Sequence, residues 1–381
     1  MIYLNHIETT QPKPQPVIDA VVRAMTTMGN ASRGTHDSAL QASQTVYQTR
    51  KKLADFFGCP RPDHVIFTSG GTDALNIALK GTLSGSCHVV LTSVSYCAII
   101  DEMNRTSDSC HISYDLIPDD TPWKDIRYNI STRIRPDTCA IICSHDCRLT
   151  GNLYDLRQIG KLAREKHLLF IADVSRSAGL YPIHMEESFI DILCCSGHKS
   201  LMGPQGTGIL CVRPGVEIRP FKHGGSGVQS YKKTQPSEYP ARLEAGTLNG
   251  HGIAGISAVL DYITKTDMEK IRQSELDLMY RFYHGISGQP AITVYGNYYS
   301  VPRLPLVNLN VEGIPAEELT DRLYRYHGIK AGIVTGTSVS GIDPTTASAS
   351  IVTAASFSFS HFNTQEETEH VIQTLLAIAG Q

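Results

Sequence analysis

The chain has 381 residues, 41% apolar and 19% charged, which is typical of a globular protein with room for an α/β core and a smaller second unit. The formal net charge is −3, the pI is near 6.6 and no basic tract stands out, so nucleic acid is not an expected partner. No apolar run has the length of a membrane span, and the first residues lack the pattern of a signal peptide. We expect a cytoplasmic protein whose ten cysteines stay reduced.

The first two thirds of the chain show apolar patterns that alternate between strand and helix. Apolar runs predict strands, and apolar residues at helical spacing predict the helices between them. Strands are expected at 65–69, 87–95, 139–145, 168–174 and 191–197, and helices at 70–83 and 155–167. This β-α-β order predicts a parallel sheet with helices on both faces, in which ligands bind at the carboxyl ends of the strands.

The rest of the chain is organised differently. A Gly-rich, basic segment from Arg219 to Gln235 is typical of a long functional loop, and a helix is expected at about 253–264. From about residue 274 the pattern predicts a smaller unit, with strands at 307–313 and 355–360 and helices at 316–328 and 365–379. We therefore expect an α/β protein with a large domain over 15–255 and a small domain formed by 1–14 and 256–381.

Three polar features lie at the ends of predicted strands, and the first is SGGT at residues 69–72. It stands between a strand and a helix, where free backbone N–H groups and the helix dipole favour an anion. Gly70 and Gly71 let the backbone approach a ligand closely, and Thr72 adds a hydroxyl donor. The simpler alternative is a plain turn in which Thr72 caps the helix.

The other two features are an acid and a lysine. Asp173 ends an apolar strand, where a carboxylate is costly unless it has a partner. A protonated pyridine nitrogen is such a partner, and a capping or turn role is the alternative. Lys199, in SGHKSLMGPQGTG, follows the strand 191–197, and its amine could form an imine with an aldehyde cofactor. Ser196 and His198 beside it are donors suited to a phosphate, whereas Lys199 taken alone would be an ordinary surface lysine.

Together and in this order, the motifs resemble the cysteine-desulfurase branch of the class V aminotransferases. The matching segments are YLNHIETTQPKP, GNASRGTHDSALQASQTVYQTRKKLADFFG, VIFTSGGTDALNIALKG, LFIADVSRSAG, SGHKSLMGPQGTGIL, EAGTLNGHGIAG and FSFSHFNTQEE, which run from residue 2 to about 370. The resemblance implies a pyridoxal 5'-phosphate (PLP) enzyme of fold type I that acts on an amino acid. Its large, cofactor-binding domain would be 15–255.

The resemblance also implies a role for each matching residue. Lys199 would hold the cofactor as a Schiff base and shuttle protons, while Asp173 would keep the pyridine nitrogen protonated. Tyr96 stands where the family has a histidine stacked on the ring, and Ser175 would pack on the opposite face. A phenol can stack, but it is a poorer proton shuttle than an imidazole. The phosphate would be held by Gly71, Thr72, Ser196 and His198, with Thr247 reaching the phosphate of the neighbouring subunit in a homodimer.

The chain departs from the family at the substrate end of the site. A desulfurase carries a cysteine on a mobile loop that takes the substrate sulfur, and the matching segment, 328–343, has none. Thr335, Thr337 and Ser338 stand there instead, and a hydroxyl cannot form a persulfide. The family arginine that grips the substrate carboxylate is replaced by Ser356.

Two arginines and two N-terminal residues are new relative to the family. Arg148 replaces an asparagine near the ring hydroxyl and the substrate carboxylate, and Arg176 replaces a glutamine that contacts the ring hydroxyl. We expect Arg148 to take over the carboxylate grip; the alternative is that both side chains point to solvent. His6 and Glu8 would lie near the substrate entrance and recognise a polar substrate, or belong to a solvated terminal loop.

Three functions remain open. The favoured one is a PLP-dependent lyase acting on a sulfur- or selenium-containing amino acid, because elimination needs no acceptor cysteine. The others are a transamination or another PLP reaction, and a non-catalytic relative that acts through a protein partner. A sulfur-acceptor protein is a further candidate partner; Cys97 and Cys147 are candidate acceptors within the chain, although buried cysteines are usually inert. Cys143, His145 and Cys147 alternate along one strand, but without a fourth ligand no metal is expected.

Overall fold

The computed structural model describes residues 1–381 except 32–33, 120, 229–232, 300–301, 339–349 and 381. In this part of the chain the larger sheet has seven strands, in the order β2-β8-β7-β6-β5-β3-β4. The strands are β2 (Val65–Thr68), β3 (Gly85–Leu91), β4 (Cys110–Leu116), β5 (Thr138–Ser144), β6 (Leu169–Asp173), β7 (Ile192–Ser196) and β8 (Gly208–Val212). Neighbours from β7 to β4 are parallel, and β8 runs antiparallel to β2 and β7. The predicted, mainly parallel sheet is confirmed.

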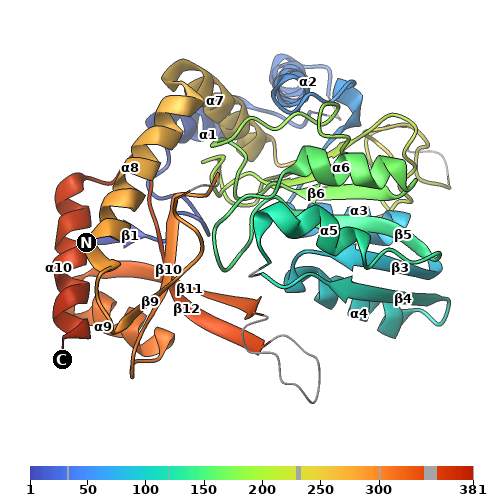
Figure 1. Ribbon diagram of the computed structural model, residues 1–381. Helices are drawn as coiled ribbons and strands as arrows, with labels where there is room; N and C mark the ends of the chain where they lie inside the picture. Colours follow the sequence, from blue (N-terminus) through green and yellow to red (C-terminus); the bar gives the residue numbers. More distant parts are fainter. Residues whose placement is uncertain (32–33, 120, 229–232, 300–301, 339–349, 381) are drawn as a thin grey trace.

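Helices cover both faces of this sheet (Figure 1). One buried cluster joins the sheet to α3 and α4, and a second joins it to α2, α6 and α7. Side chains alternate along β7, so Cys194 lies in the first cluster and Cys195 in the second. The helices of this part are α1 (Gln15–Thr27), α2 (Asp37–Phe57), α3 (Gly71–Thr82), α4 (Cys97–Thr106), α5 (Ile126–Ser131), α6 (Leu156–Glu165) and α7 (Gly250–Thr266).

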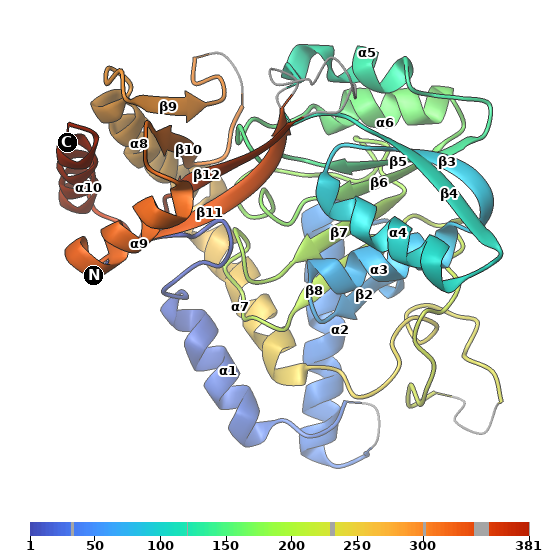
Figure 2. The same cartoon turned by 90° about the horizontal axis from the view of Figure 1, so that it is seen from below.

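A smaller sheet lies beside the larger one, with its own helices packed on it (Figure 2). Its strand order is β1-β11-β12-β10-β9, and β1 pairs in parallel with β11, so the first residues join a sheet made by the last third of the chain. The strands are β1 (Ile2–Leu4), β9 (Ile292–Tyr295), β10 (Leu306–Val311), β11 (Ile329–Ser338) and β12 (Ser350–Ser358). The helices are α8 (Met268–Ile286), α9 (Ala316–His327) and α10 (Gln365–Ala379).

Local signals fix where several of these helices begin. The Asp155 carboxylate accepts a hydrogen bond from the Gln158 backbone N–H and starts α6. Thr364 and Glu367 form a reciprocal capping box that starts α10. In the part of the chain that the structure covers, no helix is both long and apolar enough to cross a membrane.

Candidate active site

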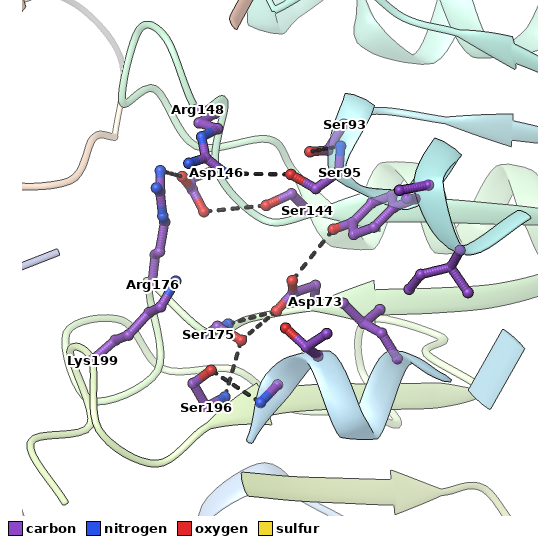
Figure 3. A pocket seen from close by; sticks show the side chains of 16 residues that line it. Ser93, Ser95, Ser144, Asp146, Arg148, Asp173, Ser175, Arg176, Ser196 and Lys199 are labelled. Carbon is purple, nitrogen blue, oxygen red and sulfur yellow. Dashed lines mark hydrogen bonds and ion pairs between the residues drawn. The ribbon is translucent and has the colours of Figure 1, made fainter. Parts of the chain in front are cut away.

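A pocket of about 270 Å³ opens at the carboxyl ends of the parallel strands (Figure 3). The segments that follow β2, β3, β5, β6 and β7 all contribute to it, because parallel strands bring their carboxyl ends to one edge. Nine of the predicted site residues line it: Gly71, Thr72, Tyr96, Arg148, Asp173, Ser175, Arg176, Ser196 and Lys199. The structure thus brings together groups that are up to 128 positions apart (Gly71 to Lys199) in the sequence.

The turn before α3 forms an anion cradle on one side of the pocket. The Gly71 N–H donates to Ser196 Oγ at 3.1 Å, and α3 begins at Gly71 with its N-terminal N–H groups at this edge. A Cβ on Gly71 would lie 2.6 Å from Ser196 Oγ and 2.7 Å from Ser175 Oγ, so only glycine fits. The hydroxyls of Ser175 and Ser196 therefore lie close to the backbone of the turn.

Asp173 lies at the floor of the pocket and is held by Ser175. Its Oδ1 accepts from the Ser175 N–H at 3.0 Å and from the Ser175 hydroxyl at 2.6 Å. The hydroxyl of the buried Tyr96 points at the other carboxylate oxygen, 3.5 Å away (Figure 3). Burial raises the pKa of Asp173 above its ordinary value, although the bonds from Ser175 and the charge of Lys199 oppose that rise. A buried acid of this kind is stabilised by a cationic partner.

Lys199 belongs to a chain of alternating charges. Its Nζ lies 3.4 Å from Glu8 Oε2, and Glu8 Oε1 accepts from Arg176 Nη2 at 2.5 Å. Arg176 Nη1 is 3.4 Å from Asp146 Oδ2. Burial would raise the pKa of Glu8, but Arg176, Lys199 and Arg148 together lower it to about 2, so the carboxylate stays ionised. The side chain of Arg176 is 8% exposed, which contradicts the alternative that it points to solvent.

Arg148 differs from Arg176 in having no ion pair with a carboxylate among the described residues. Its Nη1 donates to Ser95 Oγ at 3.3 Å, while its Nε is buried without a hydrogen-bond partner there. The backbone carbonyl of Arg148 accepts from Asn308 Nδ2 at 3.1 Å, and Asn308 pairs with Ser356 across β10 and β12. The backbone of Arg148 therefore lies near Ser356, the position at which the family would have its carboxylate-binding arginine.

Two predicted residues do not line this pocket. His198 has a half-buried side chain whose Nδ1 is buried and lacks a hydrogen-bond partner in the described residues. Its pKa is lowered to about 4, first by burial and then by the charges of Lys199 and Lys13. Thr247 lines a neighbouring pocket of about 190 Å³ with Gly206 and Asn249. The structure does not place Thr247 against the Lys199 pocket of the same chain.

Several residues that line the pocket were not predicted from the sequence. Asp146 is buried, and its carboxylate accepts from Ser144 Oγ at 3.2 Å as well as from Arg176. The strand was expected to run to 145, but β5 ends at Ser144 and the chain then turns. Asp146 carries the same signal as Asp173, an acid just after an apolar strand. The other unexpected lining residues are the polar Ser93, Ser95 and Ser144 and the apolar Leu75, Ala98 and Ile99.

The segment expected to hold the family's loop cysteine forms part of a long hairpin. β11 and β12 pair in an antiparallel register that reaches Ser338 and Ser350; residues 339–343 of that segment lie outside the described residues. Asp119, which follows β4, connects the larger sheet to β11. Its Oδ2 accepts hydrogen bonds from the Thr337 N–H at 2.8 Å and from the Thr337 hydroxyl at 3.1 Å. Thr335 is exposed on the same strand.

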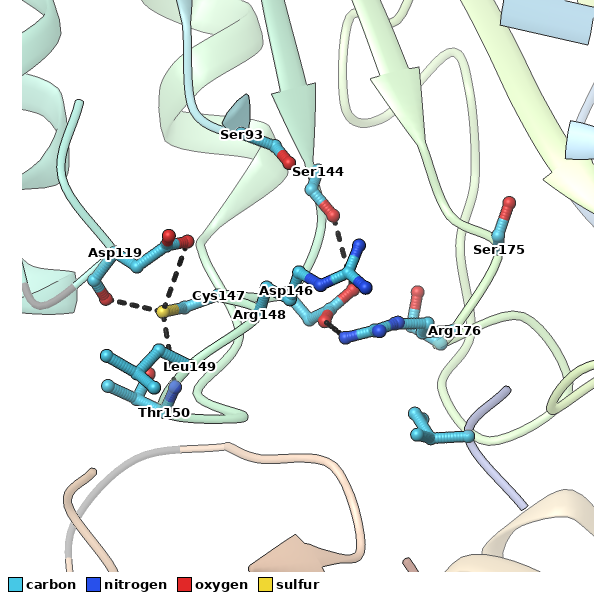
Figure 4. A network of polar contacts seen from close by, with 12 residues as sticks. Ser93, Asp119, Ser144, Asp146, Cys147, Arg148, Leu149, Thr150, Ser175 and Arg176 are labelled. Atoms are coloured by element: carbon cyan, nitrogen blue, oxygen red, sulfur yellow. Dashed lines mark hydrogen bonds and ion pairs between the residues drawn. The ribbon is translucent and has the colours of Figure 1, made fainter. Parts of the chain in front are cut away.

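The cysteines near the pocket are buried and protonated. Cys147 Sγ donates to the Asp119 carbonyl at 2.5 Å and accepts from the Thr150 N–H at 3.4 Å (Figure 4). Burial raises its pKa to about 12, and burial also raises the pKa of Cys97. Neither lines the pocket as the structure describes it. A buried thiol with a raised pKa is a poor nucleophile, so these contacts fit packing and not sulfur transfer.

The fold and the site define an enzyme class, which comparisons with known proteins specify further. The structure has the fold of cysteine desulfurases of PLP fold type I. It matches an apo cysteine desulfurase from Thermococcus onnurineus NA1 with a TM-score of 0.84 and 24% identity, covering 100% of this chain and 94% of that one. It matches CsdA from Escherichia coli with a TM-score of 0.81 and 19% identity, covering 98% and 94%.

Comparison of the sequence with known families identifies the family of this chain. Residues 2–371 match the aminotransferase class-V family, so the chain belongs to it and is an enzyme of a PLP-dependent family. Among curated relatives, cysteine desulfurase IscS of Vibrio campbellii is 28% identical, over 98% of this chain and 91% of the relative. The IscS of Shewanella woodyi is 26% identical with the same coverage. The resemblance read from the motifs is confirmed.

Proposed function

We propose that this chain is a PLP-dependent lyase that eliminates sulfur or selenium from a cysteine-like amino acid. The observation that carries the proposal is the pocket itself, in which Lys199, the buried acid Asp173 and the anion cradle at Gly71 face one another. The names of the relatives, cysteine desulfurases, support a sulfur-containing substrate. A non-catalytic role is less favoured because Lys199, Asp173 and the phosphate-binding groups are retained. Transamination is less favoured because the relatives are named cysteine desulfurases.

The residues present fit PLP. The cradle at Gly71 leaves no room for a Cβ, as expected where backbone approaches a phosphate, and Ser196 supplies a hydroxyl there. The Nδ1 of His198, which has no hydrogen-bond partner among the residues that the structure describes, is a further group suited to the phosphate. Asp173 suits a protonated pyridine nitrogen, and Lys199 Nζ would hold the cofactor covalently. In addition, Thr72 would bind the phosphate, and Tyr96, Ser175 and Arg176 would contact the ring.

The chain's own residues would divide the work as follows. Bound PLP would act as an electron sink for the charge that develops at the substrate Cα. Arg148 would grip the substrate carboxylate, since its guanidinium has no carboxylate partner in the described pocket and Asn308 fixes its backbone. Lys199 would take the Cα proton. The Cβ–S bond then breaks, and the thiolate leaves with the electron pair without an acceptor cysteine.

We also infer the assembly and location. Thr247 lies away from the Lys199 pocket of its own chain, which supports a homodimer in which it reaches the partner's phosphate. The released sulfur would pass to a small-molecule or protein acceptor, and the protein would act in the cytoplasm.

The test of the proposed function is a spectral and product assay. Wild-type protein purified with PLP should show a visible absorption band that Lys199→Ala loses. Cysteine, cystine and selenocysteine should then be offered in turn. The expected leaving groups are sulfide from cysteine, cysteine persulfide from cystine and selenide from selenocysteine, in each case with pyruvate and ammonia. A keto acid formed together with the aminated cofactor would indicate transamination instead. Absence of the band in wild type would exclude both reactions.

A further inference from the structure

The N-terminal segment carries a carboxylate to Lys199 that the roles above do not use. Thr10 binds the backbone on either side of that lysine: its N–H donates to the His198 carbonyl at 3.2 Å, and its hydroxyl donates to the Lys199 carbonyl at 2.9 Å. Lys13 Nζ also donates to the His198 carbonyl, at 2.8 Å. On the other side, the Ile7 N–H donates to Ser358 Oγ at 2.9 Å. Glu8 is thus held at a fixed place beside Lys199.

The two oxygens of Glu8 have different partners. Oε1 accepts from Arg176, which Asp146 also neutralises, and Oε2 lies 3.4 Å from Lys199 Nζ. The side chains of Lys199 and Glu8 are 20% and 38% exposed, so the pair is partly shielded from water. Arg176 therefore anchors the carboxylate, and the second oxygen is directed to the lysine.

We propose that Glu8 is a positioning residue for Lys199, whose ammonium it holds in the pocket whenever the lysine is not bound covalently. The inference rests on the proposed function. When Lys199 takes the Cα proton, its neutral amine becomes an ammonium beside a carboxylate that is already ionised. Glu8 accepts no proton; it stabilises the charge and fixes the point from which Lys199 returns the proton.

The pair does not stand alone. Other charged or titratable groups act on Lys199, on Glu8 or on both from the surrounding elements: Tyr3, Arg148, Asp173, Arg176, Cys195 and His198. These groups stay unchanged in a Glu8 variant, so a comparison with wild type isolates the carboxylate.

Glu8→Gln tests the proposal by two effects of opposite sign. Without the carboxylate, Lys199 Nζ loses the ion pair that holds it, so PLP should add to the apoprotein about three- to tenfold faster. Turnover should fall about tenfold, with KM within twofold of wild type and a larger isotope effect for substrate deuterated at Cα. Glu312→Gln removes the same charge from an exposed position and should change neither rate.

The outcomes are distinct. Slower PLP addition with slower turnover in a folded Glu8→Gln would mean that Glu8 only supports the segment, and would overturn the proposal; unchanged rates would do the same. Glu8→Asp keeps the charge and should restore the wild-type rate of PLP addition. If wild type binds no PLP at Lys199, the proposed function fails, whereas a normal wild type with an inert Glu8→Gln defeats only this inference.

Discussion

Arg148 and Arg176 line the same pocket, but their guanidinium groups have different partners. Arg176 is buried between Asp146 and Glu8, whose charges raise its pKa against the effect of burial. Among the described residues, the guanidinium of Arg148 has one hydrogen-bond partner, the hydroxyl of Ser95, at 3.3 Å. A guanidinium already bound to two carboxylates has little to gain from a third, so the substrate carboxylate should go to Arg148.

Substituting Arg148 by alanine should therefore raise KM for the amino-acid substrate by about 10- to 100-fold, the usual worth of a charge-assisted hydrogen bond. The value of kcat should change by less than about fivefold, because the proton-moving group is Lys199. Steady-state kinetics measure both. Arg105→Ala is the matched control, since that guanidinium is 73% exposed on α4. An unchanged KM would assign the carboxylate grip to another group.

At the scale of elements, the sequence predicted the strands that end in polar residues more readily than the others. β6 and β7 are apolar runs that end at Asp173 and Ser196, so both the strand and the site residue were predicted. β5 was predicted as a strand too, but its last residue, Ser144, was not predicted to line the site. β4 and β8 were not predicted. β4 is an edge strand with mixed burial, and β8 is a five-residue run that begins at Gly208, the last residue of the motif that carries Lys199.

Asp119 shows what an apolar pattern cannot reveal at this scale. It follows β4 by three positions, yet it contacts Thr337, 218 residues away. It accepts from the Thr337 N–H and hydroxyl, and its own N–H donates to the Thr337 carbonyl at 3.0 Å. These bonds tie β11 to the loop that follows β4, and no periodicity in the sequence indicates them.

Asp119→Ala should lower the free energy of unfolding by about 2–4 kcal/mol, because it strands buried Thr337 donors and leaves a small cavity. Asp119→Asn should cost less, since its amide oxygen still accepts from the Thr337 N–H. Urea denaturation measures both values, and limited proteolysis should cut within 329–358 faster in the alanine variant. Asp108→Ala, at an exposed position, provides the baseline. Equal stability of all three would show that β11 does not depend on this anchor.

At the scale of the whole molecule, the parallel strands, the lysine and the acid were predictable because each leaves a local mark. The chain of charges around Glu8 was not, because it joins residues 8, 146, 176 and 199, which only the fold brings together. The sequence placed Glu8 near the substrate entrance but could not show that it contacts Lys199. Local pattern thus gives the elements and their ends, while pairing across the pocket depends on tertiary packing.

Burial of neutral histidines should make the folded protein sensitive to acid. His145 is buried after β5 with its Nδ1 2.8 Å from Ser177 Oγ. Burial lowers its pKa to about 4, against the smaller raising effects of Asp146 and Asp155. The folded state therefore resists protonation while the unfolded chain binds a proton near pH 6.5. The stability that this neutral ring contributes is present above pH 6.5 and is lost as the pH falls toward 4. His6, whose pKa is also lowered to about 4, acts in the same window.

The contribution of His145 can be separated from those of other groups. As the pH falls from 7 to 4.5, the lowered pKa of His145 in the folded state should reduce the free energy of unfolding by about 2 kcal/mol. Glu8 loses its contribution only below pH 4.5, whereas the raised pKa values of Asp119 and Asp173 act in the opposite direction. His145→Gln keeps a group that can bond Ser177 but cannot titrate, so urea denaturation across this range should show a shallower dependence on pH than in wild type. Parallel curves for the two proteins would mean that the ring at 145 takes up its proton as readily in the folded state as in the unfolded one.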